Sequence, residues 1–287
     1  MLFRSVRIQS LKPNAYARER AKEIAQRQRG AISRIREALQ FQNGKRTGEI
    51  FGVRSGDLDE GGLHKLGYDC EHIWAQKTIA KLPDVAVGIL VDQSGSMSCR
   101  NKIVQAREMC VALAEAVKKI PGVHLHIYGH SANMHDMSDL TLFEHYSSQS
   151  DTAAQTADLA TLGGIDAFSN NYDGYAIKET AKLLAKDPAK RKYLFVIADG
   201  LPHGEGYAGP EAQKHVTSVC QFVRERLKIA TYAFAVGVHG SARDEFIEQY
   251  GQNHVMFLTE VHSCLPQIVR FLRNSLQREK TLVEVTA

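Results

Sequence analysis

Three uninterrupted runs of apolar residues, each about the length of one strand, constrain the fold of this chain most. They are VAVGILVD from Val85, YLFVIADG from Tyr193 and IATYAFAVGV from Ile229. A continuous apolar run, with no polar residue at every second position, is typical of a strand buried on both faces of a parallel sheet. The sequence therefore predicts a sheet whose central strands are covered by helices on both sides.

Amphipathic segments fill the intervals between the apolar runs. We expect strands at residues 85–92, 123–131, 140–146, 193–200, 229–238 and 255–261, and helices at residues 102–119, 175–185, 210–227, 243–250 and 263–280. Strands and helices that alternate in this way predict an α/β fold with a doubly wound, mostly parallel sheet flanked by helices.

The first 83 residues follow a different pattern. Apolar residues at helical spacing predict an amphipathic helix over residues 14–40, and the glycine-rich segment that follows predicts short elements only. Pro83 marks the point where the strand and helix alternation starts. We therefore expect a small helical and irregular N-terminal adaptor at residues 1–83 and the main domain at residues 84–287.

Composition excludes several classes of protein. The 287 residues are 44% apolar and 24% charged with a formal net charge of +4, and no apolar run is long enough to span a bilayer. The N-terminus does not read as a secretory signal, and the five cysteines never form a CxxC pair, so we expect no membrane segment and a cytoplasmic location. The basic segment at residues 18–40 is interspersed with Glu and lacks aromatic platforms, which favours a solvated helix face over a nucleic-acid partner.

Polar oxygen donors follow two of the buried strands. The first strand runs into Asp92, Ser94 and Ser96, and a later one runs into Asp199. In a doubly wound sheet, ligands bind outside the carboxyl ends of the strands, so these side chains converge if the two strands are neighbours. Carboxylates and hydroxyls without His or Cys are the ligands of a hard cation, Mg²⁺ with Mn²⁺ as the alternative. Such a set leaves the ion under-neutralised and open to an acidic oxygen from a partner.

The DxSGS motif after a buried strand, together with the later VIADG, resembles the metal-ion-dependent adhesion site of von Willebrand factor A domains. The resemblance covers residues 85–280 and implies that Asp92, Ser94 and Ser96 form one part of the site and Asp199 another. Many members of that family contribute a Thr from a further loop. Here the matching stretch, SNNYDGYAIKETAKLL, has no Thr at its head, so Asn171 or Asp173 takes that position.

Two short segments resemble a narrower group of bacterial intracellular members, which includes a cobalt-chelatase subunit and the nitric oxide reductase activation proteins. They are the Asp173-Gly174 pair before an Ala-containing helix and SGDLDEGGLHKL at residues 55–66. The resemblance implies a non-enzymatic adaptor that works with an AAA-type ATPase in metal insertion, cofactor activation or complex remodelling. It also implies that the partner supplies the last acidic ligand to the ion.

Other interpretations of these residues remain open at this point. A Ser-Gly-Ser turn after a strand can simply cap a helix, and the same holds for Asn171 and Asp173. A Mg²⁺-dependent phosphatase would use Asp92 as its nucleophile, but such a site needs a second Asp where this chain has Ser94. A phosphate-binding GxxxxGK[ST] loop is missing, so we do not expect the chain to hydrolyse ATP. A phage or plasmid protein of this fold acting on host machinery is a further alternative.

Overall fold

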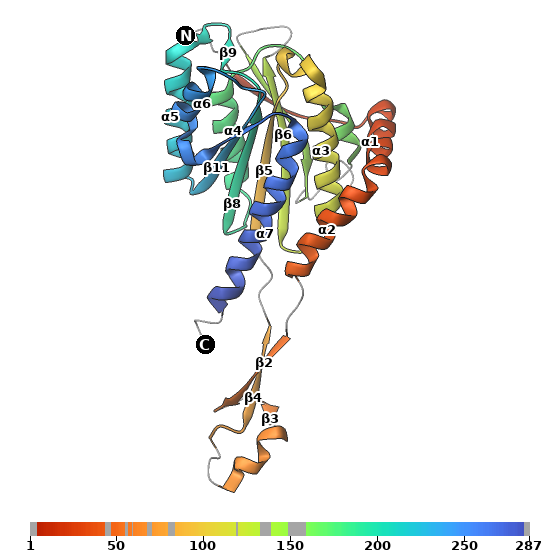
Figure 1. The fold of residues 1–287 in the computed structure, drawn as a ribbon, viewed down its shortest axis with the longest axis vertical. Coiled ribbons are helices and arrows are strands. Elements are labelled where there is room, and N and C mark those ends of the chain that lie inside the picture. The colour runs from red at the N-terminus through yellow and green to blue at the C-terminus, as the bar shows by residue number, and fades with distance from the viewer. Residues whose placement is uncertain are drawn as a thin grey trace.

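The computed structural model describes residues 5–43, 47–54, 57–58, 60–67, 71–79, 84–118, 120–132, 139–148 and 159–283. Its centre is a seven-stranded sheet in the order β1-β7-β6-β5-β8-β11-β12 (Figure 1). These strands are β1 (Val6–Ser10), β5 (Val85–Asp92), β6 (Val123–Ala132), β7 (Leu140–Ser147), β8 (Arg191–Ala198), β11 (Ile229–Val236) and β12 (Val255–Leu258). All neighbours pair in parallel except β6 and β7, so β1 and β7 run opposite to the other five strands.

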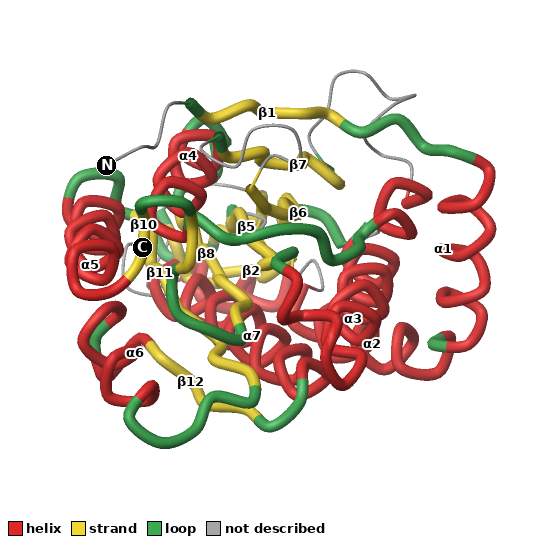
Figure 2. The backbone as a smooth tube through the Cα atoms, turned by 90° about the horizontal axis from the view of Figure 1, so that it is seen from above, coloured by secondary structure: helices red, strands yellow, loops and turns green. Residues whose placement is uncertain are grey.

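Helices cover both faces of the sheet, as Figure 2 shows from above. One face carries α1 (Ala15–Arg27), α2 (Arg29–Asn43), α3 (Lys102–Val117) and α7 (Cys264–Val283). The other carries α4 (Asp173–Ala185), α5 (Gly209–Glu225) and α6 (Ala242–Tyr250). The predicted α/β class, with a mostly parallel sheet between two helical layers, is confirmed. Within the described part of the chain, no helix has the length and apolar character needed to cross a membrane.

The central strand β5 explains why this arrangement is stable. All eight of its residues are buried, and their side chains alternate between the two helical layers. Val87 and Ile89 belong to the core under α3 and α7, while Ala86 and Leu90 belong to the core under α4 and α5. Because both faces of β5 are covered, neither needs a polar residue, which is the reason that the sequence is continuously apolar from Val85 to Val91.

The N-terminal residues take part in this main body. Strand β1 pairs with β7, and Ile24, Ile32 and Leu39 share one core with β5. The helix expected over residues 14–40 is two helices that change direction at Gln28, which lets α1 contact the turn at Leu159–Gly164 while α2 contacts α3 and α7. The described part of the expected adaptor thus packs in part on the main sheet. Pro83 lies outside the described residues, and the division into residues 1–83 and 84–287 stays a prediction.

A second, small sheet stands apart from the main body (Figure 1). It contains β2 (Thr47–Val53), β4 (Trp74–Ile79) and β3 (Asp57–Leu58), paired antiparallel in the order β2-β4-β3. A 3₁₀ segment at Glu60–Gly67 follows β3. The glycine-rich sequence correctly predicted short elements here, but it gave no indication that they pair as a sheet.

A buried cluster of polar side chains lies at the end of the sheet where β5, β6 and β8 begin. The Asp187 carboxylate lies 2.8 Å from His124 Nδ1 and 2.8 Å from His126 Nε2, and it accepts the Ala189 amide at 2.8 Å. Burial alone would raise the pKa of Asp187, but hydrogen bonds from His126, the Ala189 amide and His124 outweigh it and hold that pKa below its ordinary value. Both histidines therefore take part in this packed hydrogen-bonding cluster.

We expect Asp187→Asn to lower the free energy of unfolding by about 1–3 kcal/mol at pH 7, because two imidazoles and one amide lose a charged acceptor. A carboxyl with a depressed pKa stabilises the fold above its ordinary pKa of about 4, and this stabilisation is lost as the pH falls through the folded-state value. Urea unfolding from pH 7 to pH 2 should therefore show a difference between wild type and variant that shrinks at low pH. A constant difference would contradict this account.

Candidate metal-ion site

The site lies where the strand order of the sheet reverses. Strand β5 connects through α3 to β6 on one side, whereas β8 connects through α5 to β11 on the other. The two crossovers leave a crevice between the carboxyl ends of β5 and β8, because the loops after these strands diverge. Asp92 ends β5 and Asp199 directly follows β8, so both carboxylates lie at this crevice.

Hydrogen bonds connect Asp92, Ser94 and Ser96, at the end of β5, to Asp199, which follows β8. Asp92 Oδ1 accepts the backbone amide of Ser94 at 2.8 Å. The hydroxyls of Ser94 and Ser96 lie 3.0 Å apart, and the Ser96 hydroxyl donates to Asp199 Oδ1 at 2.7 Å. Ser94 occupies the N-cap position of the following 3₁₀ segment, Gly95–Asn101, but its side chain makes no capping hydrogen bond. Its hydroxyl is directed to Ser96 instead, which argues against a simple cap.

Asn171 and Asp173 lie beside Asp92 in the same crevice. The Asn171 side-chain amide donates to Asp92 Oδ2 at 3.2 Å and to Asp173 Oδ2 at 3.4 Å, while its oxygen accepts the His203 backbone amide at 2.6 Å. Asp173 is the first residue of α4, whose N-cap is Tyr172. Asp173 Oδ1 is buried without a hydrogen-bond partner, 3.5 Å from His130 Nε2. The structure thus brings all six expected residues together.

The carboxylates in this crevice repel one another in a buried setting. Burial and the nearby charge of Asp199 raise the pKa of Asp92 to about 7, although hydrogen bonds from Ser94 and Asn171 oppose the shift. Burial, followed by the charges of Asp92 and Asp199, raises the pKa of Asp173 well above its ordinary value. Burial also lowers the pKa of His130 to about 3, so this imidazole brings no positive charge. Positive charge placed here would relieve the repulsion.

Lys102 is the residue that sequence reasoning missed. Its ammonium donates to Asp199 Oδ2 at 2.7 Å, opposite the Ser96 hydroxyl on Oδ1. The sequence placed Lys102 correctly at the start of a helix, but a single Lys at such a position is usually solvated. Only the turn between Ser96 and α3 brings it back to the crevice, and nothing in the motif indicated that turn.

The buried side-chain amide of Gln93 packs behind the crevice. Its Nε2 donates to the Asp166 carbonyl at 2.6 Å, and its Oε1 lies 3.0 Å from His145 Nε2. A Cβ at Gly129 of β6 would lie 1.7 Å from Gln93 Oε1, so only glycine leaves room for this side chain. Asp166 is also held by Arg107 of α3 at 2.6 Å. An isolated glycine in a strand was the available signal for such a close approach.

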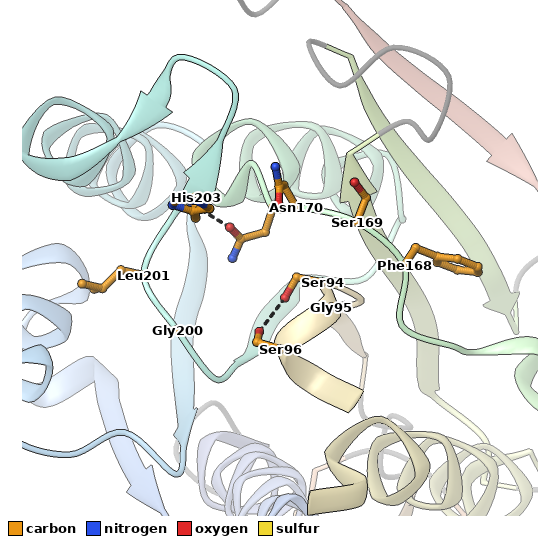
Figure 3. Close-up of a pocket in the computed structure, with 10 residues that line it drawn as sticks. Ser94, Gly95, Ser96, Phe168, Ser169, Asn170, Gly200, Leu201 and His203 are labelled. Atoms are coloured by element: carbon orange, nitrogen blue, oxygen red, sulfur yellow. Dashed lines mark hydrogen bonds between the residues drawn. The ribbon is translucent and has the colours of Figure 1, made fainter. Parts of the chain in front are cut away.

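Figure 3 shows Ser94 and Ser96 between two loops that form the walls of the crevice. The crevice has a volume of about 420 Å³. One wall is the segment from Phe168 to Asn171, which is fixed by the Phe168 amide donating to the Gln93 carbonyl at 2.7 Å. The other wall runs from Gly200 to His203. Phe168 is 43% exposed, and its ring points away from the serines (Figure 3).

The donor set fits a hard divalent cation rather than a zinc ion. Carboxylate and hydroxyl oxygens converge, one buried carboxylate oxygen has no partner, and the neutral His130 stands behind Asp173. Within the described residues, no group of three or more His, Cys, Asp or Glu side chains could hold a metal by itself. The hydroxyls of Ser94 and Ser96 would therefore have to supply part of the coordination, as is common for partly hydrated Mg²⁺.

Comparisons with known proteins find the fold but no sequence family. No family model matches the chain, and no curated protein matches it. Among solved structures, the vWF domain of the type V pili tip protein Mfa5 from Porphyromonas gingivalis superposes with a TM-score of 0.51 at 10% identity, over 68% of this chain and 96% of that one. The chain has the fold of a von Willebrand factor A domain.

A minor pilin and a pilus adhesin also superpose on the chain. The PilB minor pilin from Streptococcus sanguinis superposes with a TM-score of 0.52 at 12% identity, over 76% of this chain and 68% of that one. The pilus adhesin SpaC from Lactobacillus rhamnosus GG superposes with a TM-score of 0.56 at 10% identity, over 68% of this chain but only 31% of that one. At such low identity these likenesses describe the fold and not the ligand.

We expect Gly129→Ala to destabilise the protein by about 1–3 kcal/mol, because the new methyl group displaces the Gln93 amide from its pocket. Gly30→Ala is the matched control, since a Cβ at Gly30 of α2 meets no atom within 4 Å and alanine favours a helix. Thermal unfolding of both variants measures the difference. Equal stability of the two variants would show that Gln93 is not confined as described.

Proposed function

We propose that this protein is a non-enzymatic binding module that holds a divalent cation and uses it to bind a partner protein. The observation that carries the proposal is the set of hydrogen bonds that links Asp92, Ser94, Ser96 and Asp199 across the ends of two neighbouring strands. Oxygen donors gathered from separate loops, with raised carboxyl pKa values, form an environment that stabilises added positive charge.

The hydrogen bonds favour Asp173 over Asn171 as the ligand from the third loop. The Asn171 oxygen is already occupied by the His203 amide, whereas Asp173 Oδ1 is buried without a partner. Asn171 then orients the carboxylates of Asp92 and Asp173 through its amide group. When bound, Mg²⁺ or Mn²⁺ would supply an electrophilic centre for an oxygen ligand. The residues of this chain hold it and leave the open side of the crevice for the carboxylate of a partner.

The burial of Asp92 counts against the hydrolase alternative. Its side chain is 0% exposed, and each of its oxygens accepts a hydrogen bond. A nucleophilic carboxylate must approach the substrate in line with the bond that breaks, and a fully covered carboxylate cannot do so without rearrangement. Holding a partly hydrated ion requires no in-line attack, because a carboxylate can act on such an ion through a bound water.

The partner that we favour is an AAA-type ATPase in the cytoplasm, with the module acting in metal insertion, cofactor activation or complex remodelling. Support for this choice comes from the two segments, at residues 55–66 and 173–174, that resemble the cobalt-chelatase and nitric oxide reductase activation group. The Asp-Gly pair has a physical role in this arrangement, because it places the Asp173 carboxylate in the crevice at the start of α4.

Divalent cations should stabilise the protein against heat, and more strongly at pH 8 than at pH 5. Ion binding requires ionised carboxylates, and Asp92 has a pKa of about 7, so protons compete with the ion at low pH. Without an ion, the folded state keeps protons that the unfolded chain has released, so stability falls as the pH rises from about 4 to about 7. Thermal unfolding in Mg²⁺, Mn²⁺ or EDTA measures both effects.

The size of this stabilisation follows from mass action. At an ion concentration one hundred times the Kd it amounts to about 2.7 kcal/mol. Asp92→Asn and Ser94→Ala should abolish it, while Asp244→Asn, which removes an exposed carboxylate on α6, should leave it unchanged. A cation effect that survives Asp92→Asn would place the ion elsewhere.

Partner binding should require both the ion and the site. We expect the immobilised protein to retain an ATPase complex, in the presence of Mg²⁺, from a lysate of the cells that produce it. The bound amount should fall at least about tenfold in EDTA and for the variants Asp92→Ala and Ser94→Ala. Mass spectrometry identifies what is retained, and Asp244→Asn is again the control. Association that persists in EDTA would contradict the ion-dependent mechanism. Ion-dependent retention of a different protein would contradict only the choice of partner.

A further inference from the structure

Lys102 makes an ion pair that is far more enclosed than an ordinary surface salt bridge. The Lys102 side chain is 16% exposed and the Asp199 side chain 1% exposed. A Cβ built at Gly237, just after β11, would lie 3.7 Å from Lys102 Nζ, so the ammonium lies between the ends of β8 and β11. Solvent and salt screen such a pair only weakly. Its charge therefore acts on the whole crevice.

The backbone before Lys102 is bent in a way that side chains rarely adopt. Arg100 and Asn101 have φ values of 53° and 56°, so two successive residues with side chains lie in the left-handed region. Asn adopts this region more readily than most residues with a side chain, but Arg does not, so the conformation of Arg100 persists only where the surrounding structure enforces it. The bend separates the turn at Gly95–Asn101 from α3 and makes Lys102 the first residue of that helix, where it reaches Asp199. Backbone strain and ion pair thus occur at the same point.

We propose that Lys102 is an internal counter-ion that weakens the intrinsic affinity of the site for a divalent cation and thereby keeps the loaded site receptive to an external carboxylate. This inference rests on the proposed function. Asp92, Asp173 and Asp199 carry three negative charges when ionised and Lys102 carries one positive charge, so a divalent cation makes the crevice neutral. Without Lys102 the loaded crevice would keep one excess negative charge and would repel a carboxylate.

Lys102 also determines how Asp199 can act. Both of its oxygens already accept hydrogen bonds, Oδ1 from the Ser96 hydroxyl and Oδ2 from Lys102. An ion that enters next to Ser96 must therefore compete with the ammonium for Asp199 or leave that carboxylate behind the Ser96 hydroxyl. In the first case the ammonium weakens the bond between the ion and Asp199, and in the second case the ion lacks that anionic ligand. The missing ligand is what a partner would provide, so the ion pair couples cation binding to partner binding.

The experiment compares charge variants with Mn²⁺ as the probe, whose binding is followed by the loss of the free-ion paramagnetic resonance signal. Acetate added to the Mn²⁺-loaded protein serves as the carboxylate probe, and water proton relaxation reports its binding. Lys102→Met removes the charge and Lys102→Arg keeps it. The double variant Lys102→Met with Asp199→Asn removes one charge of each sign, so its net charge matches that of the wild type.

We expect Lys102→Met to bind Mn²⁺ at least about tenfold more tightly than wild type and, when loaded, to bind acetate at least about threefold more weakly, as charge repulsion in a weakly screened site requires. Lys102→Arg should stay within about threefold of wild type in Mn²⁺ affinity, because it keeps the positive charge. Thermal unfolding in EDTA shows which variants fold. If Lys102→Met does not fold, the double variant must bind Mn²⁺ more tightly than Asp199→Asn alone, because only the latter keeps the unpaired ammonium.

Each outcome separates the two proposals. A wild-type protein that binds no Mn²⁺ overturns the proposed function itself. A wild type that binds Mn²⁺, together with a folded Lys102→Met variant of equal Mn²⁺ affinity, leaves the proposed function intact and overturns the counter-ion role, because a merely structural salt bridge would alter stability alone. Tighter Mn²⁺ binding without weaker acetate binding also overturns it. Tighter Mn²⁺ binding together with weaker acetate binding supports it.

Discussion

The pairing of β5 with β8 is the contact on which the rest of the structure depends. Chain segments about one hundred residues apart meet there, with Val91 opposite Ile197, so that both strands release their polar loops at one edge of the sheet. The helices that follow leave on opposite faces, which opens the crevice between them. Without this pairing, Asp92 and Asp199 would belong to unrelated turns, and no set of oxygen donors would exist.

The crevice combines features that oppose stability with features that hold them in place. Buried carboxylates with raised pKa values cost free energy, since each would be better solvated in water. The scaffold around them is correspondingly rigid: the Gln93 amide is enclosed by Gly129 and His145, and Asp166 is gripped by Arg107. A site that binds a charged ligand has to be assembled before the ligand arrives, and the stability of the surrounding structure offsets the free-energy cost of holding the carboxylates together.

The sequence predicted the central fold well because the physical signals there are local. Continuous apolar runs marked β5, β8 and β11, and the ends of these strands indicated where oxygen donors would meet. The six predicted residues do lie together, although nothing in the sequence distinguished Asn171 from Asp173. That distinction depends on the His203 backbone, which comes from a different loop. Lys102 was missed for the same kind of reason, because its role depends on two successive left-handed residues, and Arg100, the first of them, does not favour that conformation.

The edge strand β1 has a consequence for how the chain reaches this structure. Val6 pairs with Leu140, so this strand must wait for a partner more than one hundred residues later in the chain. Closing so long a loop is entropically unfavourable before the remaining strands are in place, and topologies with such distant contacts fold slowly. We therefore expect the β5, β6 and β8 strands to assemble first and the N-terminal strand to dock last. We expect the helices α1 and α2 to dock late as well, because they pack on α3, which must first form on the sheet.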